Sequence, residues 1–204
     1  MERVTRSELA QLIAEKSRDK ARFMVAIAGA PGSGKSTLAT TMAAELEQAA
    51  VLPMDGFHRD NEELIALGRL HRKGAPDTFD AEGFVELMRQ LRQNDSLTYP
   101  TFDRTLDKTV PNGGRLQSET RIVLVEGNYL LLDIPPWTAL ADLFDLTVWL
   151  GEDRETLKTR LVQRWRYQGF SEAEALAQAL GNDMKNAEFA IEHSRSPEVV
   201  VVSD

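Results

Sequence analysis

The chain has 204 residues, with 24 Lys or Arg against 32 Asp or Glu, and therefore a formal net charge of −8. It contains no cysteine, which excludes a disulfide scaffold, thiolate metal sites and a cysteine nucleophile. The acidic balance argues against nucleic acid or acidic lipid as a partner. No apolar run approaches the roughly 20 residues of a membrane helix, and no apolar signal core is visible near the start. We therefore expect one cytoplasmic domain over residues 1–204.

Local patterns predict helices and strands in alternation along the chain. Thr5 and Glu8 have the spacing of a capping box, which indicates an early helix. Further helices are expected within 37–47 and within 81–93, the latter with Asp80 as N-cap. Short apolar runs typical of buried parallel strands occupy Phe23–Ala28, Val51–Met54, Arg121–Val125, Leu146–Leu150 and Glu198–Val202. This alternation predicts an open α/β sheet of parallel strands.

Two long polar segments, His58–Phe79 and Leu97–Gln117, show no sustained periodicity and are expected to be irregular. Both lie near the ends of expected strands, where open α/β sheets bind their ligands. Because long irregular segments in a compact domain are usually functional, we expect these two to line a site. Plain surface loops would produce the same pattern and remain the alternative.

The strongest motif follows the first expected strand and matches G-x-x-x-x-G-K-[ST] in full. Its glycines let main-chain N–H groups turn inward around phosphate, and the following helix adds its N-terminal partial charge. Lys35 is expected to reach the β- and γ-phosphates, and Ser36 to hold Mg²⁺. The expected nucleotide site is Gly29, Ala30, Pro31, Gly32, Ser33, Gly34, Lys35, Ser36 and Thr37. A glycine-rich turn with an incidental lysine is the alternative interpretation.

This motif indicates binding of a nucleoside triphosphate but does not specify the reaction. The sequence has no guanine-reading N-K-x-D segment and no Ser-Gly-Gly signature, so ATP is the expected nucleotide. Asp55 closes a strand and is a candidate to orient or deprotonate an attacking hydroxyl. Glu126 closes another strand and is a candidate, with Ser36, to order Mg²⁺. A turn-forming Asp-Gly pair and an exposed strand-end acid remain the respective alternatives.

Basic residues of one expected helix predict a lid over the phosphates. Arg160 and Arg164 share a helix face, where like charges repel unless an anion lies near. We expect a lid over approximately residues 160–171, hinged at Gly169 and Ser171, whose arginines stabilise charge during transfer. A solvated basic face paired with nearby acids is the alternative.

Several motifs occur in one order along the chain: the phosphate loop, Asp55-Gly56-Phe57-His58, Lys73-Gly74-Ala75-Pro76-Asp77-Thr78-Phe79-Asp80, the loop 99–110 and Val125-Glu126-Gly127-Asn128. Together they resemble the P-loop kinases grouped around uridine kinase, phosphoribulokinase and bacterial pantothenate kinase. Residues 181–187 resemble a subgroup labelled fructose transport system kinase. The resemblance implies a P-loop NTPase fold with a five-stranded parallel sheet of order 2-3-1-4-5, helices on both faces and a lid. It implies transfer of the γ-phosphoryl of ATP to an alcohol with Mg²⁺, Asp55 as the catalytic aspartate, Glu126 on the magnesium side, and a possible homodimer.

The acceptor side departs from the better-known members of that group. Where pantothenate and uridine kinases carry a tyrosine that contacts substrate, this chain has Phe102. Arg104 replaces a histidine of pantothenate kinase, whereas Asp103 keeps an aspartate of uridine kinase. Losing a hydroxyl and a histidine changes which acceptor fits, and with His58 these residues favour a small polyhydroxylated acceptor, a sugar such as fructose. A pantothenate- or nucleoside-type kinase, a regulatory ATPase without acceptor and a non-catalytic nucleotide-binding module remain alternatives.

Overall fold

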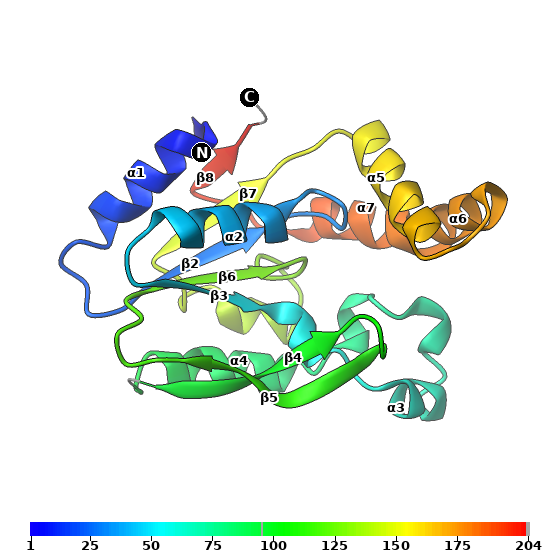
Figure 1. Cartoon of the computed structure of the whole chain (residues 1–204), viewed down its shortest axis with the longest axis horizontal. Coiled ribbons are helices and arrows are strands. Elements are labelled where there is room, and N and C mark those ends of the chain that lie inside the picture. Colours follow the sequence, from blue (N-terminus) through cyan, green and yellow to red (C-terminus); the bar gives the residue numbers. More distant parts are fainter. Residues whose placement is uncertain (95, 203–204) are drawn as a thin grey trace.

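The computed structural model describes residues 1–94 and 96–202, and its main sheet contains six parallel strands (Figure 1). Their order is β1-β8-β7-β2-β6-β3. The order expected for the five predicted strands is confirmed, but the expected number is wrong. The sixth strand, β1, has three residues and pairs with β8, and it is too short and polar to produce a periodic pattern. The strands are β1 Glu2–Val4, β2 Phe23–Ala28, β3 Ala49–Pro53, β6 Ile122–Gly127, β7 Leu146–Leu150 and β8 Val199–Val201.

Helices cover both faces of this sheet, as strands that are apolar on both sides require. Met24, Ala26 and Ala28 of β2 pack in one core with α4 (Ala81–Leu91). The intervening residues of β2 pack on the opposite face against α1 (Arg6–Lys16) and α2 (Lys35–Glu45). The predicted capping box of α1 and the predicted N-cap of α4 both form.

The segment expected to be irregular over Leu97–Gln117 is instead an antiparallel hairpin of β4 (Leu97–Asp103) and β5 (Lys108–Leu116). It lies apart from the main sheet, below it in Figure 1. The prediction failed because two prolines, two adjacent glycines and a register shift between Tyr99 and Thr101 interrupt the apolar–polar alternation. Gly56 allows a close approach, since a Cβ there would collide with the carbonyl of Pro100 in β4.

The remaining elements surround the carboxyl ends of the strands. The polar segment after β3 forms a 3-10 turn, Met54–Phe57, then α3 (Asn61–Ala66), and an isolated bridge joins His58 to Phe79. No helix within the described ranges is long and apolar enough to cross a membrane. The C-terminal part contains α5 Arg154–Tyr167, α6 Glu172–Gln178, a π-helical turn Ala179–Asp183 and α7 Met184–His193.

Candidate active site

The predicted phosphate loop connects the end of β2 to the start of α2. Gly32 and Gly34 have φ angles of +83° and +93°, a left-handed conformation that strains residues with a Cβ. The helix begins at Lys35, two residues earlier than the sequence pattern indicates, so its free N–H groups face the loop. The hydroxyl of Ser33 is buried without a hydrogen-bond partner among the described residues. A concave main chain with an unsatisfied hydroxyl is suited to bind an anion such as a triphosphate.

Arg160 of α5 contacts the main chain of this loop. Its Nη1 lies 3.3 Å from the carbonyl oxygen of Gly32 and 3.0 Å from that of Ser33, and 3.0 Å from Oε1 of Glu152. These contacts hold loop carbonyls on the side of α5. Arg160 therefore lies against the loop main chain, rather than in the cleft where we expected it to reach the phosphates.

Lys35 and Glu126 interact electrostatically beside the loop. Glu126 is 6% exposed and is the penultimate residue of β6. Burial lowers the pKa of Lys35 and raises the pKa of Glu126, because each charge loses hydration, and their mutual attraction opposes both shifts. The Ser36 side chain hydrogen-bonds to Glu126 and opposes the rise in its pKa.

Ser36 and Glu126 offer two oxygen ligands of the kind Mg²⁺ prefers. Within the described part of the chain, no group of three or more His, Cys, Asp or Glu is able to hold a metal alone. This donor set fits Mg²⁺, which usually takes few protein ligands and completes its shell with water and substrate phosphates.

Asp55 lies in the 3-10 turn that follows β3, at the same edge of the sheet. Its Oδ2 accepts an ion-pair hydrogen bond from Arg104, which comes from the tip of the β4–β5 hairpin. The interaction of Asp55 with Lys35 counteracts the lowering of the lysine pKa by burial. The two main candidates for catalysis are therefore electrostatically coupled, although they are 20 residues apart in sequence.

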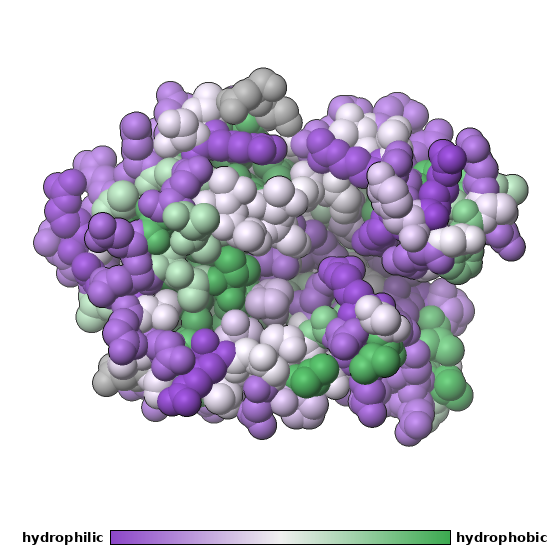
Figure 2. Space-filling view, in the orientation of Figure 1, coloured by the Kyte–Doolittle hydropathy of each residue, from purple (hydrophilic) through white to green (hydrophobic). Residues whose placement is uncertain are grey.

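A cleft of about 470 Å³ opens between Pro31 of the phosphate loop, the β4–β5 hairpin and the helices α5 to α7. Figure 2 shows this hollow on the right of the molecule, with mainly hydrophilic side chains around it. Of the predicted site residues, six line this cleft. These six are Pro31, Asp55, His58, Phe102, Arg104 and Arg164. Its described lining does not include Lys35, Ser36, Glu126, Arg160, Asp103 or the other residues of the phosphate loop.

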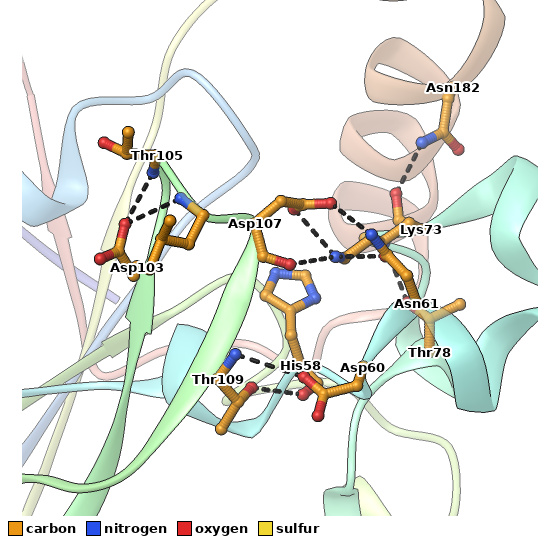
Figure 3. Close-up of polar contacts among 12 residues, drawn as sticks. His58, Asp60, Asn61, Lys73, Thr78, Asp103, Thr105, Asp107, Thr109 and Asn182 are labelled. Carbon is orange, nitrogen blue, oxygen red and sulfur yellow. Dashed lines mark hydrogen bonds and ion pairs between the residues drawn. The ribbon is translucent and has the colours of Figure 1, made fainter.

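Asp103 turns away to cap the hairpin tip. Its Oδ1 accepts hydrogen bonds from the main-chain N–H groups of Thr105 at 2.8 Å and Leu106 at 3.0 Å (Figure 3). The carboxylate thus shapes the tip that presents Arg104, and does not face an acceptor as expected from the sequence.

Lys73 holds that tip against α3. Its Nζ donates to Oδ1 of Asn61 at 2.7 Å and to Oδ1 of Asp107 at 2.9 Å (Figure 3). The same ammonium lies 5.1 Å from the centre of the Phe102 ring. Lys73 is the first residue of the Lys73–Asp80 motif that carries part of the family resemblance, but the motif alone did not indicate which role the lysine has.

His58 is packed between two rings, with centroid distances of 4.1 Å to Phe79 and 4.8 Å to Phe102. Burial lowers the pKa of His58 to about 4, with Asp55 opposing and Lys73 and Arg104 assisting this shift. The imidazole is therefore neutral near pH 7. Its Nδ1 is buried without a partner among the described residues.

The cleft wall also includes Asn128 and polar side chains from α7 and the turn before it. The sequence patterns did not indicate a functional role for these residues. Asn128 follows Glu126-Gly127, and its Oδ1 is buried with no partner in the described ranges. The segment Gly181–Asn186 supplies Asn182, Asp183 and Asn186. Asp183 accepts hydrogen bonds from Arg164 and Trp165 of α5.

Known proteins resemble this chain over nearly its whole length. A Schizosaccharomyces pombe candidate uridine kinase, C227.14, is 32% identical over 208 aligned positions, covering 95% of this chain and 88% of that protein. The Escherichia coli protein YggC is 36% identical over 186 positions, covering 88% and 77%. The structure of a candidate fructose transport system kinase from Silicibacter sp. TM1040 is 41% identical, with a TM-score of 0.92 and coverage of 97% and 98%.

The family model described as "Phosphoribulokinase / Uridine kinase family" matches residues 24–202, which include the phosphate loop, Asp55, Glu126 and α5. Kinases of this family use ATP with Mg²⁺ and phosphorylate hydroxyl groups of small molecules. The chain therefore belongs to the phosphoribulokinase/uridine kinase family and is an ATP-dependent small-molecule kinase.

Proposed function

We propose that this kinase transfers the γ-phosphoryl group of MgATP to a hydroxyl of a sugar such as fructose. The observation that carries the proposal is a polar cleft of about 470 Å³, a volume suited to a small metabolite, with Asp55 on its wall and the phosphate loop at its edge. Similarity to the candidate fructose transport system kinase, at 41% identity, supports the same substrate class.

At the nucleotide end, the main-chain N–H groups of the loop bind the phosphates, and Lys35 neutralises charge on the β- and γ-phosphoryl oxygens. Ser36 and Glu126 would hold Mg²⁺, which would supply further positive charge to neutralise the phosphoryl oxygens. Since the transition state is loose, positioning and charge neutralisation by these residues provide most of the acceleration.

At the acceptor end, Asp55 orients the attacking hydroxyl and accepts its proton as the new phosphorus–oxygen bond forms and the bond to ADP breaks. Arg104 occupies only Oδ2 of Asp55, which leaves Oδ1 for the hydroxyl. The guanidinium also keeps this carboxylate in a fixed orientation beside the cleft.

The polyol character of the acceptor is supported by two unsatisfied polar atoms on the cleft wall. These are Nδ1 of neutral His58 and Oδ1 of Asn128, both buried without partners among the described residues. A buried polar atom without a partner is costly, and a sugar hydroxyl can donate to either of these atoms. Phe102 adds an apolar face and cannot offer the hydroxyl that tyrosine would provide.

Arg164 and the lid helices close over the reacting groups and exclude water, which would otherwise accept the phosphoryl group. Arg160 acts from behind the loop, through its contacts with the carbonyls of Gly32 and Ser33.

The test is ADP release by the full chain with MgATP and a panel of hexoses, pentoses, nucleosides and pantothenate. We expect ADP release to depend on a sugar and to be lost in Asp55→Asn. Release that depends on a nucleoside or on pantothenate would replace the sugar assignment with those alternatives. Release that is equal without any acceptor would indicate a regulatory ATPase instead.

A further inference from the structure

Asp183 is a cleft residue for which neither the phosphate-loop motif nor the acceptor loop provides a role. It ends the π-helical turn Ala179–Asp183, immediately before α7, and is only 8% exposed. Single π-helical turns are uncommon and occur frequently at functional sites. The turn belongs to the Gly181–Asn186 segment, whose function the sequence did not reveal.

One oxygen of Asp183 organises two neighbouring residues of the lid helix α5. Its Oδ2 accepts a hydrogen bond from Nη2 of Arg164 at 2.9 Å and from Nε1 of Trp165 at 2.6 Å. The Arg164 guanidinium lies 5.9 Å from the centre of the Trp165 ring, and that ring packs edge-to-face on Phe170 at 5.2 Å. The Asp183 carboxylate therefore fixes the end of the Arg164 side chain, and the Trp165 ring lies next to its guanidinium group.

This arrangement restricts the orientation of the Arg164 side chain but leaves N–H donors available for a ligand. A guanidinium has five N–H donors, and the bond to Asp183 comes from Nη2 alone. Arg164 and Asp183 both line the cleft, on the side opposite the β4–β5 hairpin. A free arginine loses rotamer entropy when it is ordered, so a pre-oriented arginine loses less of it during transfer.

We propose that Asp183 is a positioning residue, which holds Arg164 ready to donate its remaining N–H groups to the phosphoryl group in transfer. The proposal rests on the proposed function, in which Arg164 closes over the reacting groups. It differs from a purely structural role for Asp183, because the effect on catalysis must pass through Arg164.

The chain contains a matched control for this ion pair. Arg154 Nε donates to Oε1 of Glu188 at 2.9 Å, so the pair also joins α5 to α7. Neither Arg154 nor Glu188 lines the cleft of about 470 Å³. Glu188→Gln therefore removes an ion pair between α5 and α7 of the same length without altering the cleft wall.

The experiment compares calorimetric affinities of the full chain for MgADP and for MgADP with aluminium fluoride, a mimic of the phosphoryl group in transfer. This readout needs no acceptor and no turnover. The proteins are wild type, Asp183→Asn, Arg164→Ala, the double variant and Glu188→Gln, each checked for its melting temperature. If Asp183→Asn does not fold, Asp183→Glu keeps the charge but moves the oxygen and takes its place.

We expect Asp183→Asn to reduce the preference for the fluoride complex by on the order of tenfold, with the MgADP affinity unchanged. Arg164→Ala should reduce this preference by on the order of a hundredfold, and adding Asp183→Asn should then cause no further loss. Glu188→Gln should behave as wild type. This non-additivity would support action through Arg164.

Three outcomes would overturn the proposal. In the first, Asp183→Asn has no effect on the preference, and in the second, its effect is equal with and without Arg164. In the third, Arg164→Ala alone has no effect, which also removes Arg164 from the proposed mechanism while leaving the acceptor assignment intact. Absence of MgADP binding by wild type would instead contradict the proposed function itself.

Discussion

The buried imidazole of His58 makes stability depend on pH in a way that can be calculated. The perturbation is acidification, combined with the substitution His58→Phe, whose ring can fill the space between Phe79 and Phe102. In the folded chain the pKa of His58 is lowered to about 4, against 6.5 for an ordinary histidine. As pH falls through 6.5, His58 binds a proton in the unfolded chain but stays neutral in the folded chain.

The sign follows from this difference in bound protons. The unfolded state binds more protons between pH 6.5 and about 4, so the free energy of unfolding decreases as pH falls through this window. From about pH 7.5 to about pH 5, the contribution of His58 amounts to about 2 kcal/mol. Above pH 6.5 this loss is absent, because both states hold a neutral imidazole there.

The assay is urea unfolding of wild type and His58→Phe at several pH values. Carboxylates that titrate below about pH 5 affect both proteins, so they cancel in the difference. We expect wild type to lose about 2 kcal/mol relative to His58→Phe over this range. A difference that stays constant with pH would show that the folded imidazole protonates normally, and would refute the neutral His58 on which the acceptor argument relies.

Three further predictions concern the nucleotide and acceptor sides. Lys35→Ala should lower turnover on the order of a thousandfold, as expected for loss of one electrostatic stabiliser, and near-normal steady-state rates would remove its assigned role. Asp55→Asn should keep MgATP affinity by calorimetry but lose phosphoryl transfer, whereas weakened nucleotide binding would make Asp55 a nucleotide or metal ligand. Lys73→Met should free the hairpin tip from Asn61 and Asp107, and raise KM for the acceptor on the order of tenfold with KM for ATP unchanged. Equal changes in both KM values would contradict this division.

Local signals in the sequence were sufficient for much of the architecture. The caps at Thr5 and Asp80 form as predicted because a cap depends on residues three positions away. The apolar run Phe23–Ala28 is a strand buried on both sides because its composition is incompatible with a solvated face. The resemblance to known kinases, rather than periodicity, implied the strand order that was confirmed.

The β4–β5 hairpin shows where local signals fail. Its strands are recognisable only through their pairing, since turn-forming residues interrupt both. The hairpin is stabilised against the body of the protein by distant contacts, such as the hydrogen bond from the Tyr99 hydroxyl to the Val51 carbonyl at 3.1 Å. Strand β1 is likewise defined by its partner β8 at the other end of the chain.

The sequence by itself determined the phosphate loop, since its glycine angles, lysine and hydroxyl follow from one contiguous motif. Only the tertiary structure decided the partners of the long charged side chains. Arg160 lies on loop carbonyls, Arg164 on Asp183 and Arg104 on Asp55. A flexible arginine reaches many positions around its Cα, and which anion or carbonyl occupies them depends on how segments distant in sequence pack together.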